Sequence, residues 1–95
     1  MTISDSWKKD FPSSGAVRHM KTIFDKLDAA VRDKDSEAIG QRVRDGAWKR
    51  DFDFAGVPES VIRMTQRDLK DAGDFAGKGD WVGATEHIER ARARW

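Results

Sequence analysis

The two histidines, His19 and His87, are the residues whose chemistry is easiest to imagine as functional. Imidazole is a common zinc ligand, and a catalytic zinc site needs about three protein ligands held by neighbouring elements. Packing of the first predicted helix against the last would bring both histidines together with Glu86 or Glu89. The chain lacks HxxxH and ExxH pairs. A metal-dependent protein built on His19 and His87 is therefore only the third hypothesis, and we expect no metal or other cofactor.

Other catalytic chemistries find little support in the residue types. The chain has no cysteine, which excludes disulfides, thiolate metal sites and cysteine nucleophiles. The serines fall at predicted turns and helix starts, where capping explains them. The segment Gly77-Lys78-Gly79-Asp80 lacks the spacing of a phosphate-binding loop. We therefore expect a protein that is not an enzyme and has no catalytic residues.

Two basic clusters, each next to a tryptophan, are the clearest candidates for a binding surface. The residues concerned are Arg42, Arg44, Lys49 and Arg50 beside Trp48, and Arg90, Arg92 and Arg94 beside Trp95. Cations near a helix C-terminus also interact favourably with the helix dipole, by about 0.3–1 kcal/mol each, which is the alternative explanation. If the fold places both clusters on one side, they would form a surface for phosphates or for an acidic protein.

The composition and length of the chain limit the functions that these clusters could serve. The 95 residues include 18 basic and 17 acidic side chains, for a net charge of +1. Such a balance argues against a dedicated polyanion binder but permits a local basic patch. The length predicts a single domain over residues 1–95. No stretch approaches the roughly 20 apolar residues of a membrane span, so we expect a soluble cytoplasmic protein that does not bind membranes.

A repeated motif organises the chain, with WKKDF at residues 7–11 and WKRDF at residues 48–52. Each copy is followed by a long helical stretch, a polar turn and a shorter helical stretch. This pattern predicts two pseudo-repeated helical hairpins, at about residues 15–48 and 57–95. The aromatic residues Trp48, Phe52 and Phe54 are too dense for a free linker, and we expect them to seal the junction between the hairpins.

Apolar residues recur at spacings of three and four within both hairpins, which is typical of amphipathic helices. They predict helices over about residues 16–31, 37–48, 58–76 and 81–95. Ser13 or Ser14, then Asp35 or Ser36, and finally Asp80 are the expected N-caps, and Pro58 the expected first residue of the third helix. No segment alternates as a strand does. The fold class expected is all-α, a compact four-helix domain.

These observations favour a small non-enzymatic protein-binding module, an adaptor or an inhibitor. Trp, Phe and Arg are enriched at interface hot spots, and Arg42, Arg44, Trp48, Lys49, Arg50, Arg90, Arg92, Arg94 and Trp95 are the predicted partner-binding residues. The alternative is a nucleic-acid-binding regulator that uses the same arginines. A homo-oligomer is left open, because Trp95 either docks on its own apolar stripe or lies at an interface.

Overall fold

The computed structural model describes residues 5–10, 13–50 and 52–95. These residues form four α-helices and two short 3-10 helices, with no strand among them. The elements are η1 (Asp5–Lys9), α1 (Ser13–Arg32), α2 (Ser36–Val43), η2 (Arg44–Lys49), α3 (Glu59–Gly77) and α4 (Trp81–Ala93). The predicted all-α, four-helix fold is confirmed.

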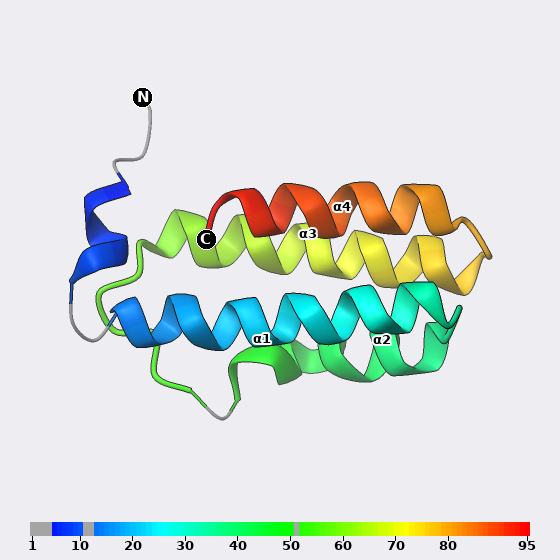
Figure 1. The fold of residues 1–95 in the computed structure, drawn as a ribbon, viewed down its shortest axis with the longest axis horizontal. Helices are drawn as coiled ribbons and strands as arrows, with labels where there is room; N and C mark the ends of the chain where they lie inside the picture. The colour runs from blue at the N-terminus through cyan, green and yellow to red at the C-terminus, as the bar shows by residue number, and fades with distance from the viewer. Residues whose placement is uncertain (1–4, 11–12, 51) are drawn as a thin grey trace.

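The helices run lengthwise beside one another, and each is antiparallel to the next along the chain (Figure 1). Helix α3 packs most extensively on α4 and also contacts α2, while α1 contacts both α2 and α4. The Cα radius of gyration of 13.0 Å is that of a compact fold of about this length. This arrangement leaves one side of α3 facing outward, with α2 along one flank and α4 along the other.

Helix starts follow local side-chain chemistry in two of the three predicted places. Asp35 and Asp80 each accept a hydrogen bond from the amide three residues on, at 3.1 Å and 2.9 Å. Ser13 behaves differently from the prediction. Its hydroxyl donates to the backbone carbonyls of Trp7 and Asp10, so it ties η1 to the start of α1 instead of accepting a free amide.

The second and third predicted helices are shifted at their ends. The helix expected over residues 37–48 ends at Val43 and continues as the 3-10 helix η2. Gly46, with a φ of +68°, has a backbone conformation that an α-helix cannot contain. Pro58 lies one position before α3 as its N-cap residue, instead of being its first helical residue.

The predicted apolar stripes meet in one core. The buried apolar residues of the four α-helices are Ala16, Met20, Ile23, Phe24, Leu27 and Ala30 in α1, Ile39 in α2, Val61, Leu69, Ala72 and Ala76 in α3, and Ala84, Ile88 and Ala91 in α4. Glycine permits close contact within this core. A Cβ on Gly83 of α4 would lie 2.9 Å from the ring of Phe75 on α3, which is closer than packing allows.

Aromatic residues close one end of the bundle, and they include Trp48 and Phe54 from the aromatic segment between the predicted hairpins. Trp48 packs edge-on against Phe54 at 5.7 Å between ring centroids, and Phe54 packs against Trp95 at 5.8 Å. Trp95 in turn contacts Trp7 of η1 at 5.5 Å. Trp48 and Trp95 are only 2% and 7% exposed. Their placement on a partner-binding surface is therefore corrected: both belong to the core.

The pseudo-repeat remains a prediction. Trp7 and Trp48, the first residues of the two motif copies, are both buried and both lie in a 3-10 helix. Phe11 of the first copy lies outside the described residues. Within the part of the chain that the structure describes, no helix combines the length and apolarity that a membrane span requires.

Candidate functional site

The outward side of α3 carries a basic surface that the two predicted clusters did not include. An open depression there is lined, among described residues, only by α3: Ser60, Arg63, Met64, Gln66, Arg67 and Lys70. Their spacing of three and four places them on one side of the helix. Three are cations, and Met64 is 43% exposed. The described lining residues include no carboxylate.

On one flank, this depression adjoins the end of α2 and η2. A second depression is lined by Arg44 and Gly46 together with Gln66 and Lys70 of α3, so the two share residues. Lys49 reaches the same place, because its Nζ donates to Oε1 of Gln66 at 3.4 Å. The first predicted cluster therefore contributes Arg44 and Lys49 to the surface over α3.

On the other flank, the depression adjoins α4. A notch between the helices is lined by Met64 and Arg67 of α3 and by His87, Arg90 and Arg94 of α4, with Asp68 and Asp71 also in its lining. Met64 and Arg67 belong to both depressions. Part of each predicted cluster therefore lies beside α3, with Arg44 and Lys49 on one flank and Arg90 and Arg94 on the other.

We call this continuous surface the basic face. It comprises Arg44, Lys49, Arg63, Arg67, Lys70, Arg90 and Arg94, with Met64 near its centre. Carboxylates are fewer and lie at its margins: Asp71 toward α4, Asp74 toward α2, and Glu59, which pairs with Arg63 at 3.1 Å. A chain whose net charge is only +1 thus concentrates positive charge over α3.

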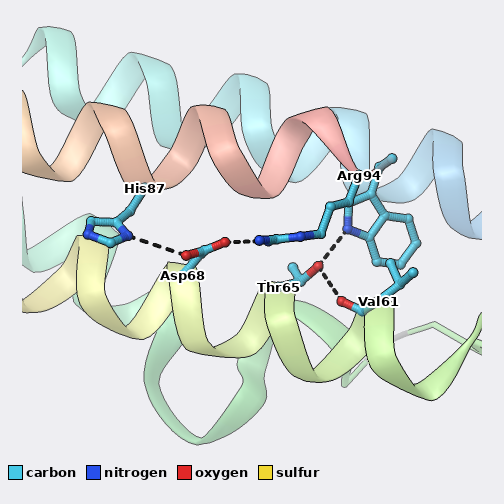
Figure 2. Close-up of polar contacts among 6 residues, drawn as sticks. Val61, Thr65, Asp68, His87 and Arg94 are labelled. Atoms are coloured by element: carbon cyan, nitrogen blue, oxygen red, sulfur yellow. Dashed lines mark hydrogen bonds and ion pairs between the residues drawn. The ribbon is translucent and has the colours of Figure 1, made fainter. Parts of the chain in front are cut away.

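A buried carboxylate fixes the α4 side of the basic face. Asp68, with a side chain only 10% exposed, accepts a hydrogen bond from the guanidinium of Arg94 and lies 3.3 Å from Nδ1 of His87 (Figure 2). Asp68 is buried because it lies on the core-facing side of α3, three residues after Thr65 and four before Ala72. Arg94 is therefore held in place. Arg90, by contrast, is exposed and forms no ion pair with another described residue.

The adjacent contacts anchor the end of the chain. The indole Nε1 of Trp95 donates to Oγ1 of Thr65 at 2.8 Å, and that hydroxyl donates to the carbonyl of Val61 at 2.7 Å (Figure 2). Thr65 is fully buried, so its hydroxyl needs both partners. Of the two roles predicted for Trp95, the structure has the docked one.

Arg92 serves the packing of α4 on α1 and lies outside the basic face. It pairs with Asp28 of α1 and with Glu89 at 2.8 Å, and its guanidinium lies 5.8 Å from the ring centre of Phe24. The hydrogen bond to Asp28 raises the pKa of Arg92 above its ordinary value. Arg42 and Arg50 are also apart: Arg42 lines a cleft between α1 and α2, and Arg50 is exposed after η2.

The histidines do not meet. Nε2 of His19 lies 2.9 Å from the carbonyl of Trp48, and its ring stacks on Phe52 at 4.8 Å, whereas His87 stacks on Phe75 at 5.2 Å beside α3. The predicted pairing of His19 with His87 is therefore wrong.

A different set of potential metal ligands does converge. Ligand atoms of Asp68, Asp71 and His87 lie within 4.8 Å of one another, the one such set of at least three among the residues described. Arg94 occupies one oxygen of Asp68, and Arg67 and Arg90 line the same notch. Three guanidinium groups around these ligands disfavour a cation there.

Sequence reasoning missed Arg63, Arg67 and Lys70, although the signal was present. They recur at spacings of four and three on the polar side of the third predicted helix. These cations do not form a run along the sequence, and only a helical projection of residues 58–76 brings them together.

Comparison with protein-family models, with curated proteins and with solved structures found no match to this chain. A functional assignment therefore depends on the chemistry of its own surfaces.

Proposed function

We propose that this protein is a small, non-enzymatic protein-binding module, an adaptor or an inhibitor, whose basic face receives an acidic segment of a partner protein. The observation that carries the proposal is the depression over α3, which presents Arg63, Arg67 and Lys70 around an exposed Met64 with no carboxylate in its described lining. Charge complementarity gives such a surface its specificity and its association rate. Methionine at the centre adapts to the apolar side chains of a partner.

The mixture of positive and negative side chains on and around the basic face favours a protein partner over a nucleic acid. Asp71 and Asp74 border the basic face on its two flanks, and Glu59 neutralises part of Arg63. These carboxylates would repel a phosphate backbone that crosses the whole surface. An acidic amphipathic helix, by contrast, can place carboxylates over Arg67 and Lys70 and an apolar side chain over Met64.

The test uses a synthetic acidic peptide, about 20 residues long, with Glu and Asp on one side and Leu at helical spacing. Fluorescence anisotropy should detect binding to the native protein. In the variant Arg67→Glu/Lys70→Glu, we expect affinity to fall by at least about tenfold, because two attractive contacts become repulsive. The matched control is Lys21→Glu/Arg32→Glu, which reverses two exposed cations of α1 and should change affinity by less than about twofold.

Equal losses in the two variants would contradict the proposal, because general charge and not the basic face would then govern binding. The same assay with duplex DNA tests the alternative. Nucleic-acid binding that exceeds peptide binding at ~150 mM salt, with a log–log salt slope of about 0.9 per neutralised phosphate, would replace a protein partner with a nucleic acid.

A further inference from the structure

A second cleft, separate from the basic face, lies between α1 and the α2–η2 segment. Its volume is about 410 Å³, within the range of small-molecule sites. One part of its lining is apolar, formed by Ile23 of α1, Ala38 of α2, and Ala47 and Trp48 of η2. Ile23 and Trp48 are buried core residues, so this wall is supported from behind. The cleft therefore offers a firm apolar surface to a ligand.

The remaining lining is polar and carries only positive charge. It consists of Lys26 and His19 from α1 and Gln41 and Arg42 from α2, with no carboxylate among the described lining residues. Lys26 and Arg42 come from different helices that face each other across the cleft. A ligand that binds here must supply hydrogen-bond acceptors, and a negative charge would be favoured.

Trp48 forms part of the apolar wall, but its indole N–H does not open into the cleft. That N–H is buried, and it has no hydrogen-bond partner among the described residues. The attraction for a ligand therefore comes from the apolar wall and from the two cations.

His19 keeps this wall in position. A carbonyl oxygen can only accept, so the contact of 2.9 Å between Nε2 and the carbonyl of Trp48 means that Nε2 carries the proton. The ring is also held by stacking on Phe52, with 13° between the two planes. Trp48 is thus held at its backbone carbonyl by His19 and at its ring by Phe54, and the cleft is formed before a ligand arrives.

We propose that this cleft is a binding site for a small organic carboxylate. Its carboxylate group accepts hydrogen bonds from Lys26 and Arg42, and its apolar body lies against Ile23 and Ala47. Arg42, which the sequence predicted to bind a partner, thereby acquires a role distinct from that of Arg44, which belongs to the basic face.

The indole ¹H–¹⁵N signals of the protein provide a direct test. We would titrate the native protein with millimolar benzoate and hexanoate, using benzamide as an uncharged counterpart and phenyl phosphate as a different anion. The signal of Trp48, assigned with Trp48→Phe, should shift, because the ligand binds against the wall that Trp48 helps to form. The signal of Trp95 is the internal control and should stay in place, because neither Trp95 nor its partner Thr65 is among the described lining residues of the cleft.

Charge-removing variants test the anion contacts. Arg42→Gln and Lys26→Gln, on separate helices, should each weaken benzoate binding by about tenfold, the loss expected for one hydrogen bond between charged groups. Lys21→Gln is the matched control on α1 and should have no effect. Arg67→Glu/Lys70→Glu should also leave benzoate binding intact, which separates this proposal from that of the basic face.

Two results would overturn the proposal. The first is a Trp48 signal that stays in place with both carboxylates, or that moves equally with benzamide. The second is binding of phenyl phosphate at least about tenfold tighter than benzoate, which would make the site a phosphate site.

Discussion

Replacing Asp68 tests how much its contacts with Arg94 and His87 stabilise the packing of α4 on α3. The carboxylate is 10% exposed, while its partners Arg94 and His87 are 24% and 16% exposed. A hydrogen bond to a charged group contributes about 1.5–3 kcal/mol. Arg94 can still reach water, so we reduce its share to about 1–2 kcal/mol. The longer contact to His87 adds about 0.5–1 kcal/mol. Asp68→Ala should therefore lower the free energy of unfolding by about 2–3 kcal/mol.

Urea unfolding followed by circular dichroism measures this loss. For a domain of this size, the melting temperature should fall by roughly 10–20 °C. Asp68→Asn keeps the shape of the side chain and should lose about half as much, because it removes only the charge. A double-mutant cycle between Asp68→Ala and Arg94→Ala should give a coupling energy of at least about 1 kcal/mol.

The control is Asp74→Asn, which changes an exposed carboxylate of the same helix and should cost less than about 0.5 kcal/mol. Equal destabilisation by Asp74→Asn and Asp68→Asn would refute the reasoning. So would a coupling energy near zero, since Arg94 and Asp68 would then act independently.

Three further substitutions test the core and its edge by the same urea measurement. Trp95→Ala should cost about 3 kcal/mol, because it empties a buried site and leaves Thr65 without its indole donor; a loss below about 1 kcal/mol would contradict docking of the chain end. Trp48→Ala should cost about 3–5 kcal/mol, and a small loss would mean that Trp48 does not seal the bundle. Arg92→Gln should lower the free energy of unfolding by about 1 kcal/mol, equally at about pH 6 and pH 9. The pKa of Arg92 is raised, so its contribution to stability is fully present below the ordinary arginine range and is lost only above it. A loss that changes between these pH values would show that a group other than Arg92 titrates there.

Much of the fold could be predicted because local chemistry and apolar spacing agree. Asp35 and Asp80 precede helices whose buried stripes follow the same period. The end of α2 could not be predicted this way, since the helix ends where Arg44 adopts an extended backbone conformation, and arginine carries no local signal for a helix end. The role of Ser13 could not be predicted for a similar reason: its acceptors are the carbonyls of Trp7 in η1 and of Asp10 just after it, and this short segment has no clear periodic signal.

The candidate site was only partly predictable, because side-chain direction depends on tertiary packing. One sequence run contains Arg90, Arg92 and Arg94, but their surroundings differ in the structure. Arg94 pairs with Asp68, Arg92 pairs with Asp28, and Arg90 is exposed. Tryptophan beside arginine indicated a binding surface, but the tryptophans are buried.

Site-specific crosslinking tests most directly whether a partner binds at the basic face. Met64 and Val82 are the two large apolar side chains most exposed among the described residues, at 43% and 72%, and only Met64 lies on the basic face. Each would be replaced in turn by p-benzoyl-phenylalanine and irradiated in the native host. We predict a protein adduct at position 64, mapped by mass spectrometry to a segment rich in Asp and Glu, and none at position 82. Adducts to the same protein from both positions, an adduct to nucleic acid, or no adduct at position 64 would contradict this prediction.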